Sequence, residues 1–248
     1  KQWRILKFNK ISERFLFMTY DNIYMAKFLS RPNRFIAHIK IDGKTEVCHV
    51  KNTGRCKELL TENATVFVQK SDNPNRKTKY DLIAVEKERK NKPPLLINMD
   101  SQIVNFVAEE WLKESGFFGK NATIRREVTF GKSRFDFFIE TENQKNFLEI
   151  KGVTLEKDGI ALFPDAPTER GLKHINELIE AKRKGYSSYI LFVIQMKEIT
   201  EFSPNSETHM EFAKSLKKAE EKGVKIMAMD CDVSPDEIKI SKEVKIHL

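Results

Sequence analysis

The segment Tyr189 to Gln195 is almost entirely apolar, and helical patterns flank it at Glu169 to Lys184 and at Ser206 to Lys222. A strand that is apolar on both faces must be covered on both faces, which is typical of a parallel strand in an α/β sheet. Further strand patterns complete the alternation at 124–130, 135–140, 146–153 and 224–229. This part of the chain is therefore predicted to form a mixed sheet whose parallel part is covered by helices.

The first part of the chain has a different pattern, made of short alternating strands. Two such stretches, 34–41 and 44–50, flank Asp42-Gly43, which is a strong hairpin signal. A short helix is expected at Arg55 to Leu60, followed by strands at 65–70 and 80–85. Several short strands with one small helix predict a compact β-barrel, of which the oligonucleotide-binding OB-fold is one kind.

The polar residues 86–92 and the pair Pro93-Pro94 interrupt the strand pattern. They predict a domain boundary, with an OB-like domain at 1–92 and a second domain at 93–248. Asp100 or Ser101 can cap the first helix of the second domain, which is expected to end at Gly116. The predicted fold class is α/β, or α+β overall.

Composition narrows the class of protein. No stretch approaches the roughly 20 apolar residues that span a bilayer, and Cys48, Cys56 and Cys231 lack metal-ligand spacing. We therefore expect a cytoplasmic protein with reduced thiols and no membrane partner. The net charge of +8 is compatible with a phosphate-bearing partner, although mixed Lys and Glu runs are usually solvated faces. Nothing in the sequence selects between a monomer and a homodimer.

The strongest chemical signal is a set of two carboxylates and a lysine on adjacent strands. Glu149 and Lys151 lie two residues apart, so the two-residue period of a strand puts them on one face. A two-residue turn at Glu142-Asn143 or Asn143-Gln144 would place Asp136 opposite Glu149 or Lys151.

Such a set has a clear chemical use. Two carboxylates can hold Mg²⁺ or Mn²⁺ between a scissile phosphate and the attacking water. The lysine can orient that water or help to deprotonate it, and can offset negative charge in the transition state. The set of side chains therefore predicts hydrolysis of phosphodiester bonds.

The pattern Glu-x-Lys also recurs by chance in this Lys- and Glu-rich chain, and the pairs that begin at Glu237 and Glu243 fall in plausible strands. Only the pair that begins at Glu149 combines apolar neighbours, a preceding strand with an acid, and a glycine directly after it, Gly152. An ion pair on a solvated edge strand remains the alternative interpretation.

A group of basic residues follows the carboxylates. Thr168 or Asp165 can cap the next helix, whose first turn carries Arg170, Lys173 and His174. The helix N-terminus and these side chains together offer an anion site. Ordinary capping with a hydrogen-bonded histidine is the alternative, and for His174 it is the preferred one.

Small polar turn residues also stand beside Arg and Lys in the first domain. A turn of this kind that leads into a helix can form a backbone nest for phosphate, although an ordinary turn with a helix cap fits equally well. The residues predicted to contact nucleic acid are Asn52, Thr53, Gly54, Arg55, Arg76 and Lys77, with Arg125 and Arg126 in the second domain.

Together these motifs resemble the sugar fermentation stimulation protein A (SfsA) family. The family pairs an OB-like domain with a domain similar to the PD-(D/E)xK nucleases, and it is described as DNA-binding. The matching segments are 49–60 (HxxNTGRxxELL), 73–78 (NPxRKT), 125–128, 133–136, 149–155 and 163–174.

The resemblance implies that Asp136 and Glu149 are metal-binding acids and that Lys151 is the catalytic lysine. Phe135 stands where the superfamily has its proline, and Glu110, or Glu109, on the first helix is expected to add an acid. The implied function is a Mg²⁺- or Mn²⁺-dependent nuclease, with DNA favoured over RNA. The alternative is a non-catalytic, DNA-binding regulator of sugar (maltose) metabolism genes.

Overall fold

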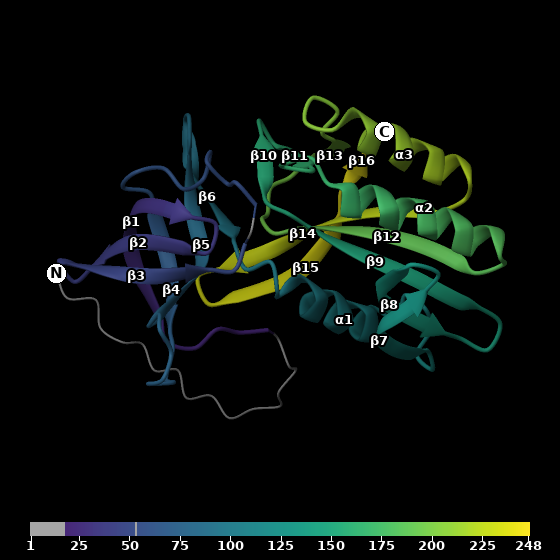
Figure 1. Ribbon diagram of the computed structural model, residues 1–248, viewed down its shortest axis with the longest axis horizontal. Coiled ribbons are helices and arrows are strands. Elements are labelled where there is room, and N and C mark those ends of the chain that lie inside the picture. The colour runs from purple at the N-terminus through teal and green to yellow at the C-terminus, as the bar shows by residue number, and fades with distance from the viewer. Residues whose placement is uncertain (1–17, 53) are drawn as a thin grey trace.

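A computed structural model describes residues 18–52 and 54–248, which form two domains side by side (Figure 1). The first domain has one sheet in the order β3-β2-β1-β4-β5-β6. Parallel pairing of β3 with β5 closes the first five strands into a barrel, as in an OB-fold. The strands are β1 (Ile23–Asn33), β2 (Ile36–Ile41), β3 (Lys44–Val50), β4 (Thr65–Lys70), β5 (Tyr80–Arg89) and β6 (Lys92–Asn98).

The turn between β2 and β3 shows how the sequence specifies this barrel. Asp42 and Gly43 both have positive φ values, of 48° and 77°. Two consecutive residues of this kind make the tight turn that matches the twist of a hairpin. The expected hairpin is confirmed.

Two local predictions in the first domain are wrong. No helix forms at Arg55 to Leu60, because Cys56 has a φ of 45° and is followed only by a turn; a left-handed residue cannot continue a right-handed helix. The stretch expected to interrupt the strand pattern is a hairpin instead, in which Arg89 of β5 pairs with Lys92 of β6. Its two prolines lie on β6, at the edge of the sheet, where a missing N–H costs little.

The second domain is built on a six-stranded sheet in the order β15-β14-β12-β9-β8-β7. Strands β9, β12 and β14 are parallel and the others pair antiparallel. The predicted mixed sheet with a parallel part is thus confirmed. Its strands are β7 (Thr123–Phe130), β8 (Ser133–Glu140), β9 (Lys145–Val153), β12 (Ser187–Ile194), β14 (Lys225–Ser234) and β15 (Glu237–Glu243).

Helices cover both faces of this sheet. Figure 1 shows α1 (Val104–Ser115) on one face, and α2 (Glu169–Arg183) with α3 (Met210–Glu221) on the other. Strand β12 is buried on both faces of the sheet. Leu191 packs with the core residues of α1, and Phe192 packs with the core residues of α2 and α3. Burial of alternate residues on opposite faces explains the continuous apolar run from which the fold was predicted.

A small third sheet has the order β10-β11-β13-β16. It consists of β10 (Leu155–Lys157), β11 (Ile160–Phe163), β13 (Glu201–Pro204) and β16 (Lys245–Ile246). Glu156 of β10 is buried and forms an ion pair with Lys87 of the first domain, with 2.5 Å between Nζ and Oε2. The small sheet therefore contacts the barrel directly.

Two further expectations concern membrane spans and the cysteines. Among the residues that the structure describes, no helix has both the length and the apolar character needed to cross a membrane. Cys48, Cys56 and Cys231 are all buried and unpaired.

Candidate functional site

The predicted carboxylate pair depends on the register between β8 and β9. Phe138 pairs with Phe147 and Phe137 with Leu148, so the next pair in the same register joins Asp136 to Glu149. Thr141 N donates a hydrogen bond of 2.9 Å to Gln144 O, which leaves a two-residue loop at 142–143. The predicted turn and register are confirmed.

Glu149 lies at the centre of the site and is 2% exposed. Its Oε1 atom accepts a hydrogen bond from Lys151 Nζ at 2.5 Å and is also hydrogen-bonded to His174 Nδ1. Its Oε2 atom is buried and has no hydrogen-bond partner among the described residues. Burial alone would raise the pKa of Glu149, but the hydrogen bond from His174 and the charge of Lys151 hold it below its usual value.

Asp136 is held in place by two donors. Asn105 Nδ2 donates to Oδ1 and the backbone N–H of Ile150 donates to Oδ2, each at 2.8 Å. Burial, and then the charge of Glu149, raise the pKa of Asp136 to about 6. A bound cation would favour the ionised form of Asp136, which burial and the charge of Glu149 oppose.

The first helix contributes a different residue from the one that the sequence indicated. Asn105 of α1 contacts Asp136, whereas Glu110 lies near Glu114 and Lys239. At about 100° per residue, five positions along a helix turn a side chain about 140° away. Glu109 is not the missing acid either, because it pairs with Lys113 and Arg126. The structure therefore replaces the predicted Glu110 with Asn105 at this position.

The basic residues of α2 divide into two kinds. His174 is 4% exposed and hydrogen-bonded to Glu149, so the preferred interpretation of a hydrogen-bonded histidine is confirmed and His174 is not available as a phosphate contact. Arg170 and Lys173 are exposed, and the amine of Lys173 donates to the carbonyl of Lys132. Thr168 is the helix cap, as one of the two sequence alternatives predicted, since its Oγ1 accepts a 3.0 Å hydrogen bond from Gly171 N.

The expected phosphate nest in the first domain is already filled by the chain itself. Gly54 N donates to Asn52 Oδ1 at 2.8 Å, and Arg55 N donates to Asp165 Oδ2 of the second domain at 3.1 Å. Thr53 lies outside the described residues. Since a carboxylate already accepts the Arg55 N–H, the prediction of a backbone nest is wrong, and of the described residues of this group only the Arg55 side chain is exposed.

The other predicted basic residues differ in their availability. Arg76 forms a forked ion pair with Asp81, at 2.8 and 2.5 Å, so its guanidinium is already engaged. Lys77 is exposed. On the edge strand β7, Arg125 lies over the ring of Phe138 and Arg126 over the ring of Phe106, at 4.8 and 4.4 Å. Both arginines remain at the surface.

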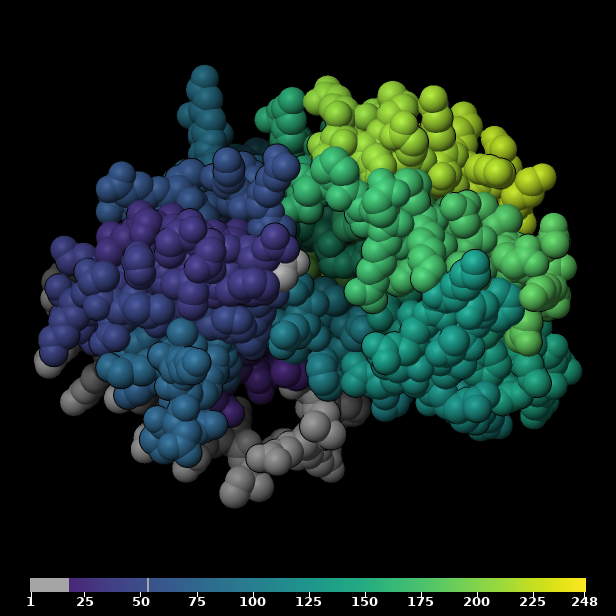
Figure 2. Space-filling view, viewed as in Figure 1, coloured from purple at the N-terminus to yellow at the C-terminus, as the bar shows by residue number. Residues whose placement is uncertain are grey.

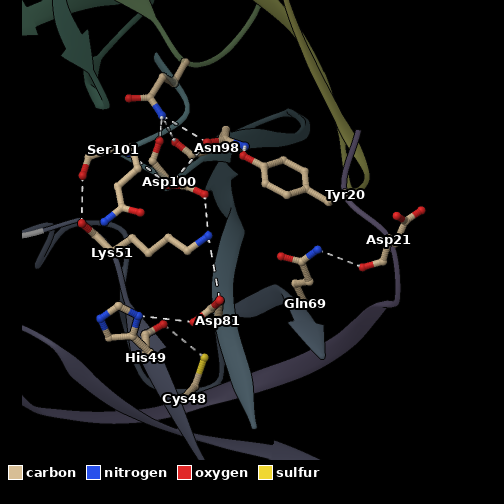
Figure 3. Close-up of polar contacts among 12 residues, drawn as sticks. Tyr20, Asp21, Cys48, His49, Lys51, Gln69, Asp81, Asn98, Asp100 and Ser101 are labelled. Atoms are coloured by element: carbon tan, nitrogen blue, oxygen red, sulfur yellow. Dashed lines mark hydrogen bonds and ion pairs between the residues drawn. The ribbon is translucent and has the colours of Figure 1, made fainter. Parts of the chain in front are cut away.

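A buried polar network joins the barrel to the second domain. Figure 3 shows Lys51 of the barrel between Asp81 and Asp100; its Nζ lies 3.8 Å from Asp81 Oδ2 and 2.8 Å from Asp100 Oδ2. The side chains of these residues are 17%, 7% and 3% exposed, respectively. Gln195, which follows β12, donates to the carbonyl oxygens of Asn98 and Asp100. The network thus ties the barrel to the end of β12 in the sheet of the second domain.

The residues of the site fit a divalent cation through two carboxylates. Within residues 18–52 and 54–248, no group of three or more His, Cys, Asp or Glu side chains is arranged to hold a metal ion. Magnesium, however, commonly binds through one or two carboxylates and keeps several waters. Two features fit such an ion. The Oε2 atom of Glu149 has no hydrogen-bond partner among the described residues, and the raised pKa of Asp136 shows that its negative charge lacks sufficient compensation.

Comparison with known proteins places this geometry in context. Residues 102–237 match the model of the sugar fermentation stimulation protein RE domain, and residues 29–92 match that of the SfsA N-terminal OB domain. Sugar fermentation stimulation protein homologs from Clostridium beijerinckii and Desulfitobacterium hafniense are each 55% identical over 93% of this chain, and the matches cover 100% and 99% of those proteins.

A solved structure is also similar. The structure of Pyrococcus furiosus SfsA in complex with Ca²⁺ matches with a TM-score of 0.82 and 27% sequence identity, covering 94% of this chain and 99% of that one. The likeness therefore extends over both domains.

Proposed function

This chain belongs to the sugar fermentation stimulation protein family, and from that premise we propose that it is a metal-dependent nuclease that hydrolyses phosphodiester bonds, with DNA favoured over RNA. The observation that carries the proposal is the pair Asp136 and Glu149. The buried Oε2 of Glu149 has no hydrogen-bond partner among the described residues, and burial and the charge of Glu149 oppose the ionisation of Asp136. The proposal includes a similarity of the second domain to the PD-(D/E)xK nucleases.

Each side chain of the site has a distinct part in this proposal. Asp136 and Glu149 Oε2 would hold Mg²⁺ or Mn²⁺, which supplies charge stabilisation to the scissile phosphate and lowers the pKa of the attacking water. Lys151 is fixed by Glu149 Oε1, so its ammonium is positioned to orient the water or offset charge on the phosphate. His174 and Asn105 position the two carboxylates.

Several observations support a nucleic-acid substrate. The first domain is an OB domain, a fold whose members bind oligonucleotides, and the chain carries a net charge of +8. Arg55, Lys77, Arg170 and Lys173 are exposed cations that can contact phosphates. The Ca²⁺ in the Pyrococcus furiosus structure supports a divalent ion. A cytoplasmic location is part of the proposal.

Cleavage assays with and without metal test this function. Labelled single- and double-stranded DNA and RNA should be cut in Mg²⁺ or Mn²⁺ and left intact in EDTA. The expected loss follows because the proposed reaction depends on the bound cation for charge stabilisation. Adding metal in excess of the chelator should restore cleavage. If the protein binds DNA but cuts no substrate with any divalent metal, the nuclease proposal fails, and the chain is instead a non-catalytic, DNA-binding regulator.

A further inference from the structure

A cavity of about 180 Å³ lies where the two domains meet. Figure 2 shows a hollow at this junction, where blue residues of the barrel face green residues of the second domain. Its walls come from the loop after β3, the segment between β6 and α1, the end of β9, β11 with the loop after it, and the residue after β12. Ligand pockets commonly measure about 300–1,000 Å³, so this one fits a single small group.

The cavity begins next to the proposed catalytic residues. Its lining includes Gly152, which directly follows Lys151 on β9. A Cβ atom at Gly152 would lie 2.7 Å from Gln195 Oε1 and 3.0 Å from Val104 Cγ1, so only glycine leaves this wall undisturbed. Consecutive Cα atoms are about 3.8 Å apart. A group in the cavity would therefore belong to a nucleotide next to the phosphate at the site.

The lining is not suited to a phosphate. Among the described residues it contains no Lys or Arg, and it does contain the carboxylate of Asp165. Asn52, Ser101 and Thr154 offer amide and hydroxyl groups, while Leu162 and Phe163 form an apolar wall. Neutral hydrogen-bonding groups beside an apolar wall are the surroundings in which enzymes hold an unstacked base.

The side chain of Gln195 supplies a hydrogen-bond acceptor at the wall of this space. Gln195 is 1% exposed, and its Nε2 is fully used by Asn98 and Asp100. Its Oε1 accepts no hydrogen bond from any described residue and lies against Gly152 at the cavity wall. A base N–H donor is the natural partner for such an oxygen.

We infer that this cavity, called here the junction pocket, binds one unpaired nucleobase next to the scissile phosphate. The inference rests on the proposed nuclease function, for which it names the substrate class: single-stranded nucleic acid, whose bases are free to leave the stack. The barrel and the catalytic sheet then share one substrate contact, because each supplies a wall of the pocket.

Binding without cleavage tests the pocket separately from catalysis. The full chain, in EDTA, is titrated with a fluorescently labelled single-stranded DNA, the matching duplex, and the same single strand carrying abasic sites. The variants Leu162→Trp and Ser101→Met enlarge two side chains that line the pocket. The control, Ile226→Trp, adds similar bulk at a half-buried position on β14 that does not line it. Thermal unfolding establishes that each variant folds.

The wild type and Ile226→Trp should bind the single strand about ten- to a hundredfold more tightly than either pocket variant does, because one base contact is worth about 1–3 kcal/mol. The abasic strand and the duplex should bind all four proteins alike. The inference would be overturned if the wild type and both folded pocket variants bound the single strand with equal affinity. It would also be overturned if the pocket variants lost the same affinity for all three DNA probes. Failure of cleavage alone would overturn the nuclease proposal and leave this result standing.

Discussion

Replacing Glu149 by glutamine is expected to lower the cleavage rate by roughly 10²–10⁴-fold, because stabilisation by a correctly held metal ion is worth several kcal/mol. Glutamine keeps the size of the side chain and an oxygen that can accept hydrogen bonds from Lys151 and His174. It removes the anionic oxygen Oε2, which has no other partner among the described residues. Initial rates on labelled single-stranded DNA at saturating Mn²⁺ give the measurement.

The matched control is Glu243→Gln. Glu243 also begins a Glu-x-Lys sequence and lies on a strand, β15, but it is exposed, and the residue opposite it on β14 is Met229 rather than an acid. Its cleavage rate should match that of the wild type. Thermal unfolding of both variants separates lost chemistry from lost structure. Wild-type cleavage by a folded Glu149→Gln protein would contradict the assigned site.

Replacing Lys51 by methionine is expected to cost about 3 kcal/mol of unfolding free energy. Removing one partner of a buried ion pair costs about 3–5 kcal/mol, and the lower end applies because the Lys51 side chain is 17% exposed. The substitution leaves Asp100 without its ion-pair partner and takes one of two cations from Asp81. Urea unfolding, with the midpoint and slope fitted together, measures the change.

Lys79→Met is the control, because Lys79 pairs with Glu46 in the same barrel but its side chain is 66% exposed. Exposed pairs contribute about 0–1 kcal/mol, so the variant should unfold within that margin of the wild type. Equal effects of the two substitutions would contradict the role given to the junction network.

The pH dependence of the Lys51→Met effect has a definite sign. Burial opposes ionisation of Asp81, but the hydrogen bonds of Arg76 and the charge of Lys51 hold the pKa of its carboxyl below the usual value. The stability that the Asp81 carboxylate contributes is therefore fully present above the pKa of an aspartate in the unfolded chain, about 3.9. It is lost as the pH falls through the lower pKa that Asp81 has in the folded protein. The difference between wild type and Lys51→Met should narrow below about pH 4.

Some of the fold follows directly from residue patterns. The two-faced burial of β12 produces an uninterrupted apolar run, and Asp42-Gly43 specifies its hairpin locally. The strands of the small third sheet contain only two to four residues, too few to show a repeat. Pro93 and Pro94 predicted a break between domains because proline is excluded from the interior of a sheet. It is tolerated on an edge strand such as β6, and the sequence does not reveal which strand lies at the edge.

Some residues of the site were likewise predictable from the sequence and others were not. Glu149, Lys151 and Asp136 were predicted because strand period and turn length determine which side chains share a face. Asn105 was missed because helix rotation relative to the sheet depends on packing, which a single helix pattern does not specify. The contact of Asp165 with Arg55 spans 110 residues, and that of Lys51 with Asp100 spans 49. Such tertiary contacts have no local signal.

The most direct test of the account is the position of a bound Mn²⁺ ion. Crystals of the protein grown or soaked with Mn²⁺, measured by anomalous scattering, should show one ion that contacts both Asp136 and the Oε2 atom of Glu149. The same experiment on Glu149→Gln should show no ion there. An ion bound elsewhere, or at this position in contact with neither carboxylate, would contradict the proposed metal-dependent nuclease.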